Sequence, residues 1–144
     1  MVAVEWSDTS LMERAIDAAQ VGRLAGERPR GAAARLGDLV VVRHDETSLR
    51  GDPMAHAVAL LLTALGRELG SWRLEGVTVA TTHEPCVMCA GALTAARVAR
   101  LVFGVADPAA GAVGSLHNVA VDLRLGHEIE VVSGVLAQAC SALG

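Results

Sequence analysis

The hydrophobic pattern of the chain predicts five short strands. Each is a run of aliphatic and β-branched residues bounded by Gly or by polar residues, which is typical of strands in a protein core. The predicted strands cover residues 32–36, 39–43, 77–80, 100–104 and 128–132. Gly37 and Asp38 separate the first two strands, and a Gly-containing pair in this place predicts a hairpin.

Longer stretches, either amphipathic or apolar throughout, predict helices. These helices cover residues 7–22, 54–69, 87–96, 115–123 and 133–143. Ser10 with Glu13 fits a capping box in the first helix, and Ser133 is expected to cap the last one. The helix at 54–69 is apolar at nearly every position from 57 to 62, which indicates burial on most sides, either against another subunit or by a thick sheet alone.

The order of these elements predicts a three-layer α/β sandwich around a mixed sheet, because strands alternate with helices after an initial hairpin. The pattern alone leaves the number and order of the strands open. We find no internal repeat and no linker, so the 144 residues predict a single domain, 1–144.

The amino-acid composition indicates where the protein is located and which partners it can bind. Hydrophobic residues make up 52% of the chain, which excludes disorder, and charges or Gly interrupt every apolar run before it reaches membrane-spanning length. The N-terminus has no signal-peptide pattern and the cysteines are few, so we expect a cytoplasmic protein. A net charge of −4 and only three aromatic side chains give weak support to nucleic-acid binding. The arginines of the first fifty residues are expected to be solvated.

Two cysteines follow the predicted strand at 77–80. Pro85 suits the first turn of the next helix, which places Cys86 and Cys89 on one face of its N-terminus. Free N–H groups and the helix dipole favour thiolates there. The pair forms half of a metal site; a redox pair or two packed thiols are the alternatives for an isolated Cys-x-x-Cys. Cys140, the third cysteine, is interpreted as a packed core thiol.

A histidine at a second helix start completes the metal site. Asp52 is the predicted cap and Pro53 the first helical residue, which places His56 in the first turn. His56, Cys86 and Cys89 then provide three protein ligands. Three ligands with a water in the fourth position are typical of catalytic zinc sites. The sequence therefore predicts one Zn²⁺ per chain.

The segments 56–58 and 84–89, His-Ala-Val and Glu-Pro-Cys-Val-Met-Cys, resemble the zinc-dependent deaminases of bases and nucleosides. The signature of those enzymes is H-x-E…P-C-x-x-C. The resemblance is greatest to bacterial tRNA adenosine deaminases and extends over most of residues 51–143. It implies the five-stranded cytidine-deaminase-like fold. It also implies a dimer, formed through the helices at 54–69 and 86–96, that completes each pocket across the interface.

Val58 departs from that signature at the position of the glutamate. In the family this glutamate is not a ligand, and it carries protons from the water to the ring nitrogen and the leaving ammonia. Val58 can neither accept nor donate a proton, so the resemblance implies a zinc site without its proton shuttle. The non-catalytic subunit of the eukaryotic wobble-adenosine deaminase also carries Val in this place.

Two other carboxylates are candidates for the missing role. Glu84 precedes Pro85, and its simpler role is to cap the start of the following helix. Asp45 lies about where the tRNA deaminases place an asparagine that contacts the target nucleoside, so it is a candidate for both substrate binding and catalysis. His83 and His117 are expected to be structural or exposed.

Three functional hypotheses follow. The first is a catalytically silent, zinc-binding subunit that binds a ligand or a partner, as a homodimer or as a heterodimer with an active paralogue. The second is an active hydrolytic deaminase of a base, a nucleoside or tRNA adenosine that uses another proton carrier. The third is a structural protein in which zinc is only a staple. The sequence does not identify the substrate.

Overall fold

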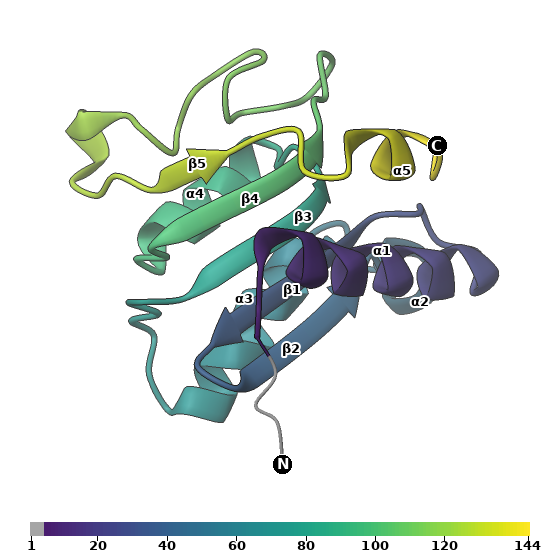
Figure 1. The fold of residues 1–144 in the computed structure, drawn as a ribbon, viewed down its shortest axis with the longest axis horizontal. Helices are drawn as coiled ribbons and strands as arrows, with labels where there is room; N and C mark the ends of the chain where they lie inside the picture. The colour runs from purple at the N-terminus through teal and green to yellow at the C-terminus, as the bar shows by residue number, and fades with distance from the viewer. Residues whose placement is uncertain (1–4) are drawn as a thin grey trace.

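The computed structural model describes residues 5–144 and places five strands in one sheet (Figure 1). Residues 1–4, with which the predicted single domain begins, lie outside the described part. The strands are β1 (Gly31–Leu36), β2 (Leu39–His44), β3 (Thr78–His83), β4 (Arg100–Val105) and β5 (Glu130–Val132). The helices are α1 (Asp8–Leu24), α2 (Thr47–Arg50), α3 (Ala57–Leu69), α4 (Val87–Ala95) and α5 (Ala137–Ser141), with a 3₁₀ turn η1 (Leu123–Leu125).

The sheet is mixed, with the strand order β2-β1-β3-β4-β5. The predicted hairpin is confirmed, because β1 and β2 pair antiparallel down to Leu36 and Leu39. β1 is also antiparallel to β3, whereas β3, β4 and β5 run parallel. The parallel pairs require crossovers, and α4 provides the one between β3 and β4. The carboxyl end of β3 therefore leads directly into the cysteine-bearing helix.

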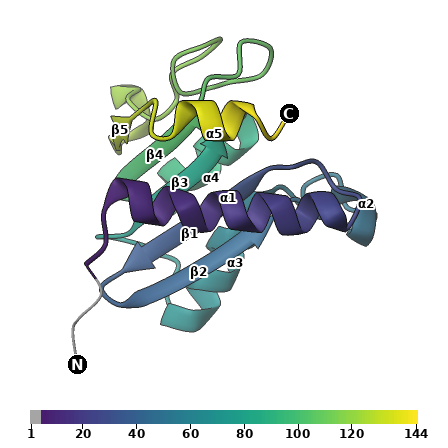
Figure 2. The same cartoon turned by 45° about the vertical axis from the view of Figure 1, so that its right-hand side comes forward.

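Helices cover both faces of the sheet, which confirms the three-layer architecture. α1 and α5 lie on one face (Figure 2), where Met12 and Cys140 belong to a buried cluster. α3 and α4 lie on the other face over a larger core that includes Leu61 and Leu93. Cys140 is fully buried, as its interpretation as a packed thiol requires. No helix within residues 5–144 has the length and apolar character needed to cross a membrane.

Several predicted helix starts are wrong, and the reason is capping. Ser7, not Ser10, caps α1, in a reciprocal capping box with Ser10. α3 begins at Ala57, because the stretch before it folds into a turn in which the Asp52 carboxylate accepts from the N–H of Met54. His56 is consequently the N-cap of α3 rather than a residue of its first turn, and Pro53 is not its first helical residue. The short helix α2 precedes this turn.

The C-terminal third is less regular than predicted. The helix expected at 115–123 is absent from the described chain, and only η1 forms beyond it. The backbone of residues 115–123 is held instead by contacts with neighbouring segments, such as the β-bridge between Val113 and Asn118. The last helix is shorter than predicted and begins after Leu136, which has a positive φ of 52°, so Ser133 does not cap it.

Candidate metal centre

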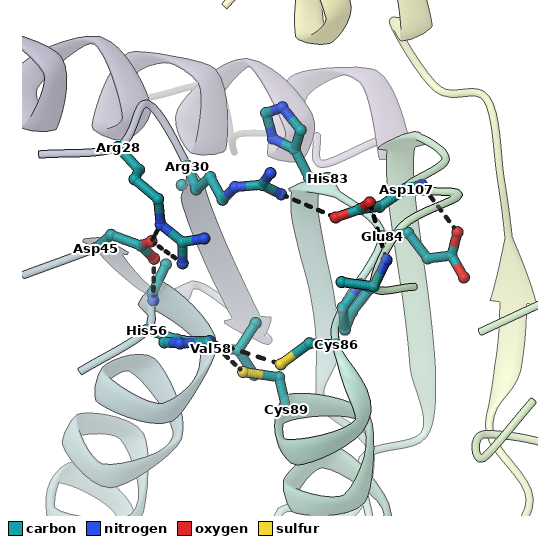
Figure 3. A pocket seen from close by; sticks show the side chains of 14 residues that line it. Arg28, Arg30, Asp45, His56, Val58, His83, Glu84, Cys86, Cys89 and Asp107 are labelled. Atoms are coloured by element: carbon teal, nitrogen blue, oxygen red, sulfur yellow. Dashed lines mark hydrogen bonds and ion pairs between the residues drawn. The ribbon is translucent and has the colours of Figure 1, made fainter. Parts of the chain in front are cut away.

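Three predicted ligands meet where two helix starts converge. His56 is the N-cap of α3, Cys86 is the N-cap of α4, and Cys89 lies in the first turn of α4 (Figure 3). Pro85 thus lies just before α4 and not within it, which corrects its predicted place. Both helices lie on the same face of the sheet and contact one another. Their first residues therefore aim three donor groups at one point.

The spacing of the donor atoms fits zinc. Nδ1 of His56 lies 3.6 Å from Sγ of Cys86 and 3.5 Å from Sγ of Cys89. A tetrahedral centre with Zn–S of about 2.3 Å and Zn–N of about 2.0–2.1 Å separates N from S by roughly 3.6 Å. All three donor atoms lie within 4.8 Å of one another. The arrangement leaves the fourth tetrahedral direction to a non-protein ligand.

The environment of the thiols also favours a cation. Burial, followed by the neighbouring Cys86, raises the pKa of the Cys89 thiol. The helix dipole that favours a thiolate here is therefore outweighed by desolvation and by the second sulfur. A cation placed between the sulfurs reverses this effect, because metal coordination deprotonates thiols.

Val58 lines the cavity in which the donor atoms lie. Val58 lies in the first turn of α3, two residues after His56, and is 5% exposed. In Figure 3 it lies between the histidine and the two cysteines. The cavity has a volume of about 140 Å³, which is small beside the roughly 300–1,000 Å³ of sites for drug-sized ligands.

Asp45 lines the same cavity, but its carboxylate holds the protein together. The N–H of Ala57 donates to Oδ1 at 2.7 Å, while Arg28 donates to Oδ2 from Nε at 2.9 Å and from Nη2 at 2.6 Å. Asp45 is 1% exposed. It therefore caps α3 from a distance, next to the metal ligand His56, and both of its oxygens are occupied.

Glu84 does not cap α4, which corrects that prediction. Its buried carboxylate accepts from the N–H groups of Asp107, Val113 and Ser115, and from the Ser115 hydroxyl. Burial alone would raise the pKa of Glu84, but these bonds, that of the Ser115 hydroxyl first, hold the pKa below its usual range. Glu84 thus anchors the segment that follows β4. A Cβ at Gly111 would collide with this carboxylate, which its hydrogen bonds hold in place, so glycine is required there.

The structure adds cavity residues that the sequence analysis did not assign. Four further charged or titratable residues line the cavity: Arg28, Arg30, His83 and Asp107. Among them, only Arg28 and Arg30 lie next to a feature visible in the sequence, Pro29 just before a predicted strand. The two arginines were expected to be solvated surface groups and are instead at the cavity mouth. His83 is half-buried, with its Nδ1 at 2.8 Å from the Thr82 hydroxyl.

Fold and site together define a zinc-binding deaminase scaffold, and comparison with known proteins agrees. Residues 5–105 match the model of the cytidine and deoxycytidylate deaminase zinc-binding region. The chain belongs to this family, and its His/Cys/Cys centre is the zinc site typical of it.

The proteins similar to this chain include tRNA adenosine deaminases and a guanine deaminase. A tRNA-specific adenosine deaminase of Bacillus subtilis is 39% identical over 94% of this chain and 85% of its own length. A structure from studies of A-to-I editing by tRNA:A34 deaminases superposes with a TM-score of 0.90 at 32% identity, covering 94% of this chain and 99% of that one. A guanine deaminase of Nitrosomonas europaea has a TM-score of 0.82 at 23% identity, covering 98% and 84%, and shares the fold.

Proposed function

We propose that this chain is a catalytically silent, zinc-binding deaminase homologue that acts as a ligand-binding or partner subunit. The observation that carries the proposal is Val58, which lines the metal cavity at the position of the glutamate in the family signature. Bound zinc would supply a Lewis acid and a water of lowered pKa. Val58 offers no group that accepts or donates a proton in the steps that follow.

The other carboxylates of the cavity support this proposal, because each is already engaged. Asp45 accepts hydrogen bonds on both oxygens, and Glu84 accepts four. Oδ1 of Asp107 accepts from the N–H groups of Ala109 and Ala110, whereas its Oδ2 has, among the described residues, only the ion pair with Arg30 at 3.7 Å. A general base must reach the proton that it abstracts, and these acceptors are directed at the protein itself.

The second candidate function is hydrolytic deamination of a base, a nucleoside or tRNA adenosine. It is favoured by the relatives, since a tRNA-specific adenosine deaminase is 39% identical to this chain. For this function one of the engaged carboxylates, Asp45 or Glu84, must leave its present partners. The third candidate, zinc as a staple alone, requires that no ligand enters the cavity.

We further propose that the chain forms a dimer through α3 and α4, with a second copy or with an active paralogue. An apolar groove runs along the outer side of these helices and is lined by small residues such as Ala59 and Ala95. Trp72 lies in it and is 64% exposed, and Val87 on α4 is also exposed. Apolar surface of this kind commonly marks a contact site. The three free cysteines agree with the cytoplasm as the proposed location.

The decisive experiment is a screen for ammonia release from cytosine, guanine, adenine, their nucleosides and tRNA, with the zinc content of the same samples measured in parallel. Zinc-loaded protein without turnover supports the silent subunit. Deaminated product from the isolated chain would establish the second candidate. Less than half a zinc per chain, unchanged in Cys86→Ala, would contradict the zinc site. Sedimentation tests the dimer: a monomer at micromolar concentration, alone and with the paralogue, would refute it.

A further inference from the structure

Two arginines stand at the mouth of the zinc cavity. Arg28 and Arg30 flank Pro29 in the loop between α1 and β1, and both line the cavity with His56 and Cys86. Figure 3 shows their side chains entering it from the side opposite the cysteines. A guanidinium has five N–H donors in a planar fork that fits carboxylate and phosphate oxygens.

Arg28 is positioned by Asp45 and retains unused donors. It donates from Nε and Nη2 to a single oxygen of Asp45, at 2.9 and 2.6 Å. Half of its side chain remains exposed, 51%, whereas that of Asp45 is 2% exposed. The buried carboxylate therefore fixes the guanidinium in place, and the remaining N–H groups are free to meet a ligand.

Arg30 is held more loosely. Among the described residues its acidic partner is Asp107, at 3.7 Å from Nη1 to Oδ2, which is too long for a hydrogen bond. The side chain of Arg30 is only 28% exposed, so its charge is partly desolvated. Asp107 does not depend on this pair, because the N–H groups of Ala109 and Ala110 hold its other oxygen. Arg30 can thus turn to a ligand without leaving Asp107 unsatisfied.

The nearby histidine adds no positive charge to this wall. Burial, and after it the charge of Arg30, lowers the pKa of His83 to about 4, against the opposing effects of Asp107 and Asp45. His83 is accordingly neutral at pH 7 and offers a ring nitrogen, not a third positive charge. An acid group that enters the cavity meets two guanidinium groups there, beside the carboxylates of Asp45 and Asp107 that face them.

We propose that the zinc cavity binds a small molecule that carries a phosphate or a carboxylate, and that Arg28 and Arg30 hold this acid group. The proposal rests on the ligand-binding role proposed above and names its ligand class. A small molecule fits better than an RNA strand, because the chain has a net charge of −4 and only three aromatic side chains. Charge-assisted, bidentate hydrogen bonds are the strong interactions available to such a ligand.

The test is calorimetric titration of the zinc-loaded protein with inorganic phosphate and with acetate at low ionic strength, which limits screening. We expect at least one of the two anions to bind, and the preferred one to identify the acid group. Arg30→Gln should weaken binding roughly tenfold or more, since hydrogen bonds to charged groups are worth about 1.5–3 kcal/mol. Arg30→Lys should fall between, because it keeps the charge and loses the fork. Arg14→Gln, on the other face of the sheet, is the matched control and should bind like the parent.

Two results would overturn the proposal. One is the absence of binding of both anions at millimolar concentration to protein that holds its zinc. The other is binding that Arg30→Gln and Arg14→Gln leave equally unchanged, which would assign the anion to the metal alone. Zinc content and ammonia release, measured on the same samples, separate this failure from that of the proposed function. A zinc-loaded chain without turnover can still be the silent subunit when neither anion binds.

Discussion

At the scale of single residues, the proposed loss of activity depends on one side chain. If Val58 alone silences the cavity, Val58→Glu should raise ammonia release from background to a measurable rate. A positioned general acid–base contributes about 10²–10⁴-fold. The apolar surroundings of residue 58 would raise the pKa of the new carboxyl group towards the working pH, which suits a proton shuttle, although burying it costs stability. Ammonia release by the parent and the variant, at equal zinc content, is the measurement.

Val58→Gln is the matched control for this prediction, because it has the size of glutamate and no titratable group. It should stay at background while Val58→Glu rises. We expect partial rescue only, since Asp45, for which the resemblance predicts a nucleoside contact, is here paired with Arg28. A parent that already turns over at a rate typical of enzymes, with Val58→Glu no faster, would make the silent-subunit proposal wrong. The search for the base would then begin at Asp45 and Glu84.

Asp45 acts on the metal centre through its neighbours. Asp45→Ala removes the acceptor of the Ala57 N–H, beside the ligand His56, and leaves Arg28 without its partner. We expect a loss of about 1–3 kcal/mol in the free energy of unfolding, the usual cost of stranding a buried hydrogen-bonding group, together with weaker zinc retention. Urea unfolding and competition with a zinc chelator measure the two effects.

The control for Asp45 is Asp52→Ala. Asp52 also accepts a backbone hydrogen bond, from the N–H of Met54, but in an exposed turn ahead of α3. Its replacement should change stability little and leave zinc retention intact. Equal effects of the two substitutions would show that Asp45 has no special role at the metal.

At the scale of elements, an ion pair joins the start of α1 to β4. Arg100 forms a bidentate pair with Asp8, with one of its two hydrogen bonds 2.8 Å long. The hydrogen bond from Arg100 lowers the pKa of Asp8, against the opposing effect of burial. Stability from this pair is therefore present above the unfolded pKa of about 3.8 and is lost as the pH falls through the lower folded value.

Asp8→Asn tests this pH dependence. The variant should be less stable than the parent near pH 7, by no more than about 1 kcal/mol because the pair is partly exposed. The difference should shrink below pH 4 as Asp8 is protonated in the parent, which urea midpoints at several pH values will measure. A difference that stays constant down to pH 2 would assign the effect to packing and not to charge.

The elements themselves could largely be predicted, whereas their ends could not. The strands follow runs of β-branched and aliphatic residues, and burial on both faces preserves that local pattern. Helix starts depend on which group satisfies the first free N–H groups. For α3 that group is Asp45, which is distant in sequence, so the local signal at Asp52 and Pro53 was misleading. The helix predicted at 115–123 does not form for a similar reason. The Glu84 carboxylate, distant in sequence, accepts hydrogen bonds from the N–H groups of Val113 and Ser115 and so fixes the backbone there.

At the scale of the whole molecule, zinc links α3 to α4. Both helices begin at the centre, so metal binding favours the folded state by mass action. Removal of zinc by a chelator should lower the Tm by several degrees, as is expected for a loss of a few kcal/mol in a domain of this size. Differential scanning calorimetry with and without chelator measures the shift.

Cys86→Ala is the control for the chelator. The variant lacks one ligand and should show the lower Tm in both conditions. A parent with bound zinc and a Tm that the chelator does not change would mean that the metal contributes nothing to folding.

The metal centre was more predictable than the cavity around it. His56, Cys86 and Cys89 each lie at or next to a helix start, and the sequence predicted that they form one site, although the exact helix starts differ. The remaining walls depend on tertiary contacts: Arg28 and Arg30 reach the cavity from the loop before β1, and Asp107 follows β4. Strand order and strand number came from the resemblance, since alternation of strands and helices fits more than one order.

Val58 lies beside the three metal ligands but is not one of them. A change at residue 58 therefore leaves the ligand set intact, and this has a genetic consequence. Some codons for valine and glutamate differ by a single base, so one mutation can place a carboxylate at residue 58 while the ligands stay in place. The Arg28–Asp45 pair differs in this respect, because replacing Arg28 alone leaves the buried Asp45 carboxylate without its cation. Under the proposed function, one substitution can therefore supply the proton shuttle, whereas a change in the Arg28–Asp45 pair also costs stability.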